Sequence, residues 1–411
     1  MRQFKDSGIE WIGKIPENWQ NKRFKNSGVF EKGKLPNSSN IDRNGFPIIG
    51  ASEMLGKDAR TYTSDDSVPR CKEEDILILW DGANAGITAS GLTGVVSSTA
   101  VKYVCKDKSV LPKYAAYLLK YGEHYFKEKV NGTTIPHMNM AYINDIPLLC
   151  PPITEQQRIA DYLDLKCGEI DSLVGLQEQM IEKLKAYKQS VITEAVTKGL
   201  DPNAKLVPSG IDWIGEIPEG WNTIRIKYLL RERKERSETG EEEPLSMSQK
   251  CGLIPTKDMD MIPNMASSFI GAKVVHISDL VFNKLKAHLG VFSVSKYYGL
   301  VSPDYAVYFS TGRTELKYLE YLFKTPQCIG EFRKRSTGVG AGLTRLYTAD
   351  LFSILIPFPP LSEQHSIATY LDEKCADIDR LIALKQQKIE ALKDYKKSII
   401  YEAVTGKTII E

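Results

Sequence analysis

Apolar residues recur every three or four positions over two long stretches of the chain, and mainly Glu, Lys, Gln and Asp fill the positions between them. In residues 155–196 the apolar stripe consists of Ile170, Leu173, Val174, Ile181, Leu184, Tyr187, Val191 and Ala195. In residues 363–404 it consists of Ile378, Leu381, Ile382, Ile389, Leu392, Tyr395, Ile399 and Ala403. This spacing is typical of a helix with one apolar face. Each stretch therefore predicts a helix of about 44 residues, roughly 65 Å long.

Signals for a helix start and a helix end flank both stretches. Thr154 and Ser362 precede them and are natural N-cap residues. Gly199 and Gly406 follow them, at the position where a helix commonly ends in a left-handed residue.

The two stretches are copies of each other. Residues 155–196 align without gaps on residues 363–404, an offset of 208, and 25 of the 42 positions are identical. A second repeat opens each half: "SGIEWIGKIPENW" from Ser7 and "SGIDWIGEIPEGW" from Ser209 share ten of 13 positions. The chain is therefore a tandem duplication. Each half has an opening motif, a variable body of roughly 130 residues and a long helix.

A single apolar stripe of this length is not stable alone, and its own copy is the nearest suitable partner. We therefore expect the helices to pair as an antiparallel coiled coil about a pseudo-twofold axis. The alternative is that each helix packs on its own body. Cys167 and Cys375 are expected to be small apolar spacers in the seam. The residues expected to pair the helices are Ile170, Leu173, Ile181, Leu184, Val191, Ile378, Leu381, Ile389, Leu392 and Ile399.

The variable bodies are predicted to be globular and of mixed structure. Short apolar runs broken by glycine, as in residues 73–106 and 278–310, are typical of strands and turns. A short helical pattern follows in each body, and the two bodies align only loosely. The predicted fold class is α+β, with two mixed α/β bodies separated by the long helices. The predicted domains are residues 1–150, 151–200, 201–358 and 359–411.

Composition limits the class of protein without deciding its function. The chain carries 54 Lys and Arg against 52 Asp and Glu, a net charge of +2, which argues neither for nor against nucleic acid. Seven cysteines without a CxxC pair indicate reduced thiols. No apolar run approaches the length of a membrane span. We expect an intracellular, cytoplasmic protein.

The sequence lacks a recognisable catalytic pattern. "GKT" at residues 406–408 has no upstream P-loop glycine, because position 401 is Tyr401. "STGVGAG" from Ser336 follows a basic stretch and does not fit a dinucleotide fingerprint. The five histidines show no metal-ligand spacing. These absences favour a binding protein or a scaffold over an enzyme, and predict no metal site.

The repeated "WIGxIPExW", "PPxxEQxxIxxYLD" and "YKxSxIxEAV" patterns together resemble the specificity subunit of type I restriction–modification enzymes. The resemblance covers the whole chain, although the bodies match more loosely. It implies that residues 1–150 and 201–358 are target-recognition domains, each reading one half of a split double-stranded DNA site. The helices would set the spacing and hold two methyltransferase subunits, which restriction and translocase subunits join. S-adenosylmethionine, ATP and Mg²⁺ would then bind to the partner subunits, and this chain would hold no cofactor.

Candidate DNA contacts in the first body lie in "WDGANAG" from Trp80 and "GTTIPHMN" from Gly132. Polar side chains there could read base edges, while Trp80 could equally be a core residue. The candidate contacts in this body are Asn84, Thr133, Thr134, His137 and Asn139.

In the second body, "NKLKAHLG" places Lys284, Lys286 and His288 at alternate positions, which share one face if the segment is a strand. An exposed edge strand with solvated lysines is the alternative. "FRKRSTGVGAGLTRL" adds basic residues beside glycines that allow close approach to a backbone. These are Arg333, Lys334, Arg335 and Arg345.

Overall fold

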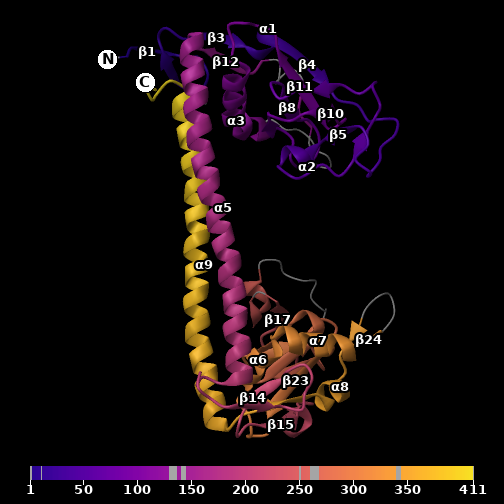
Figure 1. The fold of residues 1–411 in the computed structure, drawn as a ribbon. Helices are drawn as coiled ribbons and strands as arrows, with labels where there is room; N and C mark the ends of the chain where they lie inside the picture. The colour runs from indigo at the N-terminus through magenta and orange to yellow at the C-terminus, as the bar shows by residue number, and fades with distance from the viewer. Residues whose placement is uncertain are drawn as a thin grey trace. The chain divides into compact units, whose positions relative to one another are not determined.

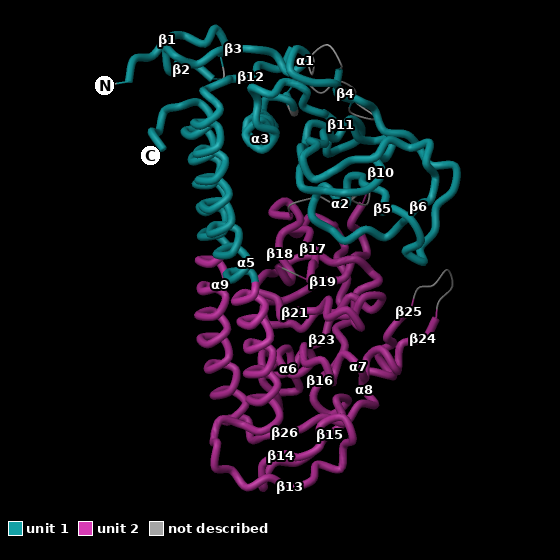
Figure 2. Tube along the Cα trace, turned by 45° about the horizontal axis from the view of Figure 1, so that its top comes forward, with its two compact units in different colours: residues 1–178, 386–411 teal, residues 179–385 magenta. Residues whose placement is uncertain are grey.

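A computed structural model describes residues 2–10, 12–128, 137–139, 145–249, 251–259, 268–338 and 344–410. The chain divides into two compact units, and the division passes through both long helices (Figure 2). Unit 1 consists of residues 1–178 and 386–411, and unit 2 consists of residues 179–385.

Unit 1 is built on two four-stranded sheets. One has the strand order β4-β11-β8-β9 and is antiparallel, with Val104 of β11 opposite Val29 of β4. The other has the order β6-β5-β10-β7, in which β5 and β10 are parallel. The described elements before the first long helix are β1 (Phe4–Asp6), β2 (Lys14–Pro16), β3 (Gln20–Arg23), α1 (Phe24–Ser27), β4 (Gly28–Lys32), β5 (Phe46–Ile49), α2 (Ala51–Met54), β6 (Tyr62–Thr63), β7 (Arg70–Cys71), β8 (Ile76–Leu79), β9 (Thr88–Ala89), β10 (Gly94–Val96), β11 (Ala100–Cys105), α3 (Pro112–Glu128) and β12 (Pro147–Cys150).

Unit 2 repeats the central antiparallel sheet with the order β16-β23-β20-β21. Val281 of β20 lies opposite Val307 of β23, and both are buried. The described elements of its body are β13 (Leu206–Pro208), β14 (Glu216–Pro218), β15 (Asn222–Arg225), β16 (Leu230–Glu232), β17 (Leu245–Ser248), β18 (Gly252–Pro255), β19 (Lys273–Val275), β20 (Leu280–Asn283), β21 (Phe292–Val294), β22 (Gly299–Val301), β23 (Tyr305–Ser310), α6 (Leu316–Phe323), α7 (Pro326–Arg335), β24 (Thr337–Gly338), β25 (Thr344–Arg345), α8 (Thr348–Ser353) and β26 (Leu355–Phe358), with short 3₁₀ turns at Ile226–Tyr228, Thr256–Asp258 and Ala287–Leu289.

The two predicted long helices are present. They are α5 (Ile153–Lys198) and α9 (Leu361–Val404), which fall within the expected ranges 151–200 and 359–411 (Figure 1). The mixed α+β class with long helices is therefore confirmed. The short strands broken by glycine appear as β8–β11 and β20–β23, and the helical patterns that follow appear as α3 and α6.

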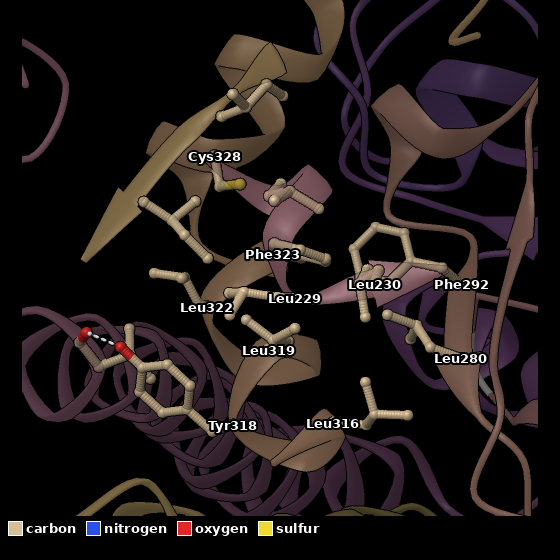
Figure 3. Packing of buried hydrophobic residues seen from close by; sticks show 14 of the residues in the cluster. Leu229, Leu230, Leu280, Phe292, Leu316, Tyr318, Leu319, Leu322, Phe323 and Cys328 are labelled. Carbon is tan, nitrogen blue, oxygen red and sulfur yellow. Dashed lines mark hydrogen bonds between the residues drawn. The ribbon is translucent and has the colours of Figure 1, made fainter. Parts of the chain in front are cut away.

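The main core of unit 2 joins the body to both long helices. Aromatic rings of Phe282, Phe292, Phe323 and Phe332 stack or meet edge to face, with centroids 4.5–6.2 Å apart. The same cluster includes residues of α5 and α9 as well as the body residues labelled in Figure 3. In unit 1 an equivalent cluster joins the body to α5 and α9. Within each unit, the body and the helix segments therefore share one hydrophobic core.

Candidate nucleic-acid interface and its helical frame

The repeated opening motif holds the start of a long helix by a tryptophan. Trp19 Nε1 donates to the Glu155 carboxylate at 3.2 Å in unit 1, and Trp221 Nε1 donates to Glu363 at 3.0 Å in unit 2. Both rings are buried. In each half, the last residue of the opening motif therefore donates a hydrogen bond to the glutamate of the "EQ" pair. This bond links the two repeated motifs.

The glutamine of each "EQ" pair joins the helix start to the body. Gln156 and Gln364 are both 0% exposed. Gln156 accepts from the backbone N–H of Leu111 at 2.8 Å, and Gln364 accepts from that of Glu315 at 3.0 Å. Each amide also donates to the carbonyl of a nearby proline at 2.9 Å. A buried amide with its bonds satisfied fixes one orientation between the helix and the body.

In each unit, a tyrosine of the body donates a hydrogen bond to the C-terminal end of the long helix that begins in the other unit. Tyr114 OH donates to the Val404 carbonyl of α9 at 3.2 Å in unit 1. Tyr318 OH donates to the Val196 carbonyl of α5 at 3.0 Å in unit 2 (Figure 3). These carbonyls are among the last four of their helices, which have no partner within the helix. Burial raises the pKa of both phenols well above the usual range, so both remain donors.

Both predicted glycine caps are present and close-fitting. Gly199 has φ +77° and Gly406 has φ +70°. A Cβ on Gly406 would lie 2.9 Å from the ring of Trp19, and one on Gly199 would lie 3.3 Å from that of Trp221. Glycine is needed here for its left-handed conformation and for this close approach.

The helix halves run antiparallel within each unit. In unit 1, Lys396 of α9 pairs with Asp171 of α5 at 2.7 Å. In unit 2, Lys188 of α5 pairs with Asp379 of α9 at 2.6 Å. The 208-residue offset relates these two ion pairs, so the duplication preserves the register. Cys167 and Cys375 are buried as expected, and burial raises the pKa of both thiols.

The pairing residues that we expected are not all in the seam. Leu173 and Leu381 are 42% and 48% exposed, which corrects their assignment. Buried or half-buried positions follow alternating steps of three and four residues, and this seam includes Val174 and Ile382 instead. The other expected residues are buried (Ile170, Ile181, Ile378, Ile389, Ile399) or half-buried (Leu184, Val191, Leu392).

In the first body, the structure brings the two predicted loops together. His137 Nδ1 lies 2.6 Å from an Asp81 carboxylate oxygen, and Met138 N donates to the Trp80 carbonyl at 2.9 Å. Trp80 is half-buried against the unit 1 core, and Lys32 lies over its ring at 5.2 Å. Among the other candidates, Asn84 is half-buried and Asn139 is exposed, whereas Thr133 and Thr134 lie outside the described residues.

In the second body, the expected strand through Lys284, Lys286 and His288 is wrong. Strand β20 ends at Asn283, and residues 284–290 form turns around the 3₁₀ segment Ala287–Leu289. Gly290, with φ +77°, ends that segment, so the three side chains do not alternate across a sheet. Lys284 is half-buried, and burial together with the charges of Lys273 and Arg345 lowers its pKa.

The remaining basic candidates surround the hairpin β24–β25. Lys334 and Arg335 at the end of α7 both pair with Glu331, the former at 2.9 Å. Arg345 pairs with Asp304 at 2.9 Å, and its buried Nε has no hydrogen-bond partner among the described residues. Arg333 is exposed. The structure therefore groups these cations on neighbouring elements of unit 2 and holds most of them with carboxylates.

Two other kinds of feature are absent from the described residues. None of the described helices is both long and apolar enough to cross a membrane. The part of the chain that the structure describes also holds no group of three or more His, Cys, Asp or Glu side chains suited to a metal ion.

Comparison with known proteins supports the same class of protein. The family described as "Type I restriction modification DNA specificity domain" matches residues 16–186 and 273–394. The MjaVIII specificity subunit of Methanocaldococcus jannaschii is 27% identical, over 96% of this chain and 94% of that protein. The EcoDI specificity subunit of Escherichia coli is 20% identical, over 96% and 89%.

Two solved structures share the fold. A chain from work on complex assembly and conformational transition of the type I R-M system gives a TM-score of 0.68 at 16% identity, covering 96% of this chain and 99% of that one. The HsdS subunit of Thermoanaerobacter tengcongensis gives 0.50 at 17% identity, covering 96% and 98%.

A duplicated frame that carries two divergent bodies thus defines the class. The chain belongs to the family of type I restriction–modification DNA specificity proteins. Membership confirms the class predicted from the repeated motifs, a specificity subunit rather than a catalytic one.

Proposed function

We propose that each unit reads one half of a split double-stranded DNA site, and that the two half-sites differ. One observation carries the proposal. The same frame contacts, Trp19–Glu155 and Trp221–Glu363, hold bodies whose candidate contact surfaces have different chemistry. The first offers Trp80 and His137, whereas the second offers a cluster of arginine and lysine. Different side chains read different base edges, so the complete site should not be a palindrome.

We infer that the long helices also dock partner subunits. Unit 1 exposes Leu173 and Leu176 of α5 and Tyr395 of α9. Unit 2 exposes their counterparts in the duplication, which are Leu381, Leu384 and Tyr187. Large apolar side chains gathered on a surface favour a partner site. Two equivalent sets favour two copies of one partner, which we take to be the methyltransferase subunit.

The remaining components are assigned to the partners. S-adenosylmethionine, ATP and Mg²⁺ would bind to the methyltransferase and the restriction or translocase subunits, with none on this chain. The assembled enzyme would act on DNA in the cytoplasm, with the helices setting a fixed gap between half-sites.

Binding to duplex DNA tests the reading function. The chain, co-purified with the methyltransferase subunit of its source cell, should bind a genomic duplex that contains its site more tightly than a scrambled one, and binding should weaken with salt. Equal affinity for both duplexes, or preference for RNA, would instead support a scaffold that binds other partners.

Native mass spectrometry tests the docking surfaces. We expect one copy of this chain with two methyltransferase subunits, because the two exposed sets are equivalent. Changing Leu173 and Leu176 to Ser should reduce the complex to one partner, and the matched change of Leu381 and Leu384 should do the same. A one-to-one complex of the unaltered chain at saturating partner would contradict the proposal.

A further inference from the structure

A basic hollow lies in unit 1, between the loop that precedes β5 and the segment that joins α2 to β6. Its volume is about 560 Å³. The loop Asn40–Gly45 forms one wall, and the segment Gly56–Tyr62 forms the other. Arg43, Lys57 and Arg60 line it against a single carboxylate, Asp58. The lining therefore carries an excess of two positive charges.

Hydrogen bonds preset the loop wall. The backbone of Asn40 bonds twice to that of Tyr62, both at 2.9 Å, and joins the two walls. The Asn40 side chain accepts from the N–H groups of Asp42 and Asn44 and donates to the Asn44 carbonyl at 2.9 Å. Gly45 has φ +93°, and a Cβ there would lie 2.2 Å from the Thr63 carbonyl oxygen. The loop can therefore hold its shape before any ligand arrives.

Arg43 sits in a strained backbone conformation within this loop. Its φ is +60°, a left-handed value that is uncommon for any residue with a side chain other than Asn or Asp. Such strain persists where surrounding contacts impose it, and it gathers at functional sites. Asn40 supplies those contacts here. Asparagine or glycine would fit this backbone conformation better, so arginine adopts it at a cost in free energy.

The opposite wall is equally well defined. Helix α2 ends at Met54, and Gly56 follows its C-cap residue with φ +83°. The N–H of Gly56 bonds to the Glu53 carbonyl at 3.0 Å, and that of Lys57 bonds to the Ser52 carbonyl at 3.0 Å. This pair of bonds is the Schellman motif, which fixes the direction in which the chain leaves the helix. It places Lys57 at the hollow.

In the part of the chain that the structure describes, the three cations have no anionic partner of their own. Within the described residues, Arg43, Lys57 and Arg60 make no ion pair or side-chain hydrogen bond. Some other cations of unit 1 do, such as Arg23 with Asp145 at 2.5 Å. Unpaired arginine and lysine around a preformed hollow suit a phosphate group, whose oxygens accept several charged hydrogen bonds.

The second body has an acidic loop between β16 and β17. The Ser237 N–H bonds to the Ala272 carbonyl at 2.9 Å, and the Ser237 hydroxyl accepts from Gly240 N at 2.7 Å. The loop after Ser237 carries Glu238, Glu241 and Glu242. The Ser237 hydroxyl lowers the pKa of Glu242, so this carboxylate stays ionised. This loop of unit 2 therefore repels phosphate.

We propose that the hollow of Arg43, Lys57 and Arg60 holds one backbone phosphate of the duplex, beside the half-site that unit 1 reads. This inference rests on the proposed DNA-reading function. Ile41 at the rim is 79% exposed. An apolar side chain beside the cations suits a phosphate that is joined to deoxyribose better than a free ion. The contact would supply affinity and register without sequence information.

The test measures duplex affinity by fluorescence anisotropy over a salt series, with the methyltransferase complex. Arg43→Gly removes the cation and relieves the strained backbone, so its melting temperature should not fall. Affinity should fall about tenfold, equally for the cognate and the scrambled duplex. The slope of log affinity against log salt should decrease by about 0.9, the value for one phosphate contact. The slope should decrease no further in the triple variant that combines Arg43→Gly with Lys57→Ala and Arg60→Ala.

Two further variants distinguish a preformed phosphate site from a non-specific effect of positive charge. Gly45→Ala keeps every cation but disturbs the loop, and should weaken binding as Arg43→Gly does. Arg23→Ala removes one exposed cation of unit 1 elsewhere, and should leave the slope unchanged.

Several results would overturn the site. An unchanged slope in Arg43→Gly while the unaltered complex binds its site would remove this inference alone. Weakening confined to the cognate duplex would assign base reading instead of phosphate contact. Stabilisation by inorganic phosphate without DNA, lost in Arg43→Gly while duplex affinity stays constant, would assign a free-ion site. Absence of sequence-dependent binding by the unaltered complex would remove the proposed function, and this site with it.

Discussion

At the scale of residues, two tryptophan side chains secure the helix starts. Each indole nitrogen donates to a glutamate, at 3.2 Å for Trp19 and at 3.0 Å for Trp221. The sequence predicted a repeated frame from these motifs. It did not predict this bond, because the partners lie 136 and 142 residues apart and only the folded chain brings them together.

Changing Trp19 or Trp221 to Phe should destabilise its unit by about 2 kcal/mol, because a hydrogen bond to a charged group is lost from a buried site. Urea unfolding measures the change. Trp213→Phe is the matched control, since Trp213 is half-buried at the edge of the core that holds Trp221 and makes no side-chain hydrogen bond among the described residues. Equal losses for all three variants would show that ring size matters and the bond does not.

Asp107 gives a pH-dependent prediction. The Lys22 ammonium, then the hydroxyl and N–H of Ser109, lower the pKa of this carboxylate to about 2. Its pKa in the unfolded chain is about 3.9. A lowered pKa contributes stability above the unfolded value, and that stability is lost as the pH falls toward the folded value.

Asp107→Asn should therefore be less stable than the unaltered chain at pH 5 and should approach it at pH 2. Thermal unfolding at both pH values measures the difference. A difference independent of pH would mean that Asp107 acts through its shape and not through its charge.

The candidate contact residues show where residue-level prediction fails. Alternation predicted one face for Lys284, Lys286 and His288, but the residues beyond a strand decide where it ends. Here Asn283 accepts from Leu285 N at 3.2 Å and begins a turn. The basic hollow was missed for a related reason, because Arg43, Lys57 and Arg60 are scattered in sequence and a backbone bridge brings them together.

At the scale of elements, the helix pair follows its repeat closely. Apolar spacing predicted both helices to within two residues of their observed starts, because a long regular pattern specifies a helix strongly. It misplaced Leu173 and Leu381, since a broad stripe holds more apolar residues than a narrow seam can bury. The ion pairs Lys396–Asp171 and Lys188–Asp379 connect α5 and α9 and favour this register of the two helices.

The helices should act as a ruler. In unit 2 the pairs Lys188–Asp379 and Met180–Lys385 place the Lys185–Ala186 junction of α5 level with residues 380–381 of α9. Four residues inserted at both places add about one turn, roughly 6 Å, and keep the seam nearly in phase. The gap between half-sites should lengthen by one or two base pairs at roughly 3.4 Å each, as mapping of methylated adenines would show.

Controls separate length from damage. Four residues inserted only between Lys185 and Ala186 should lengthen the gap by fewer base pairs than the paired insertion, because α9 then lacks matching residues. A two-residue insertion turns the seam by about 200° and should abolish activity. An unchanged gap in the paired insertion, or a rewritten half-site, would mean that the helices do not set the spacing.

At the scale of the whole molecule, the duplication predicted the organisation of the chain. The two long helices are identical at 25 of 42 aligned positions, so the constant frame can be recognised from the sequence. The bodies have diverged, and their contact surfaces depend on long-range packing that no repeat reveals. Each unit nevertheless joins a body to halves of both helices, so the units share a frame while their surfaces differ.

Exchange of one body tests the central claim most directly. Residues 29–144 would be replaced by the first body of another family member, and methylated adenines would be mapped across the host genome before and after. Independent reading predicts that one half-site changes, while the other half-site and the gap stay the same. A change in both half-sites, or in the gap, would contradict the account of two separate readers on one constant frame.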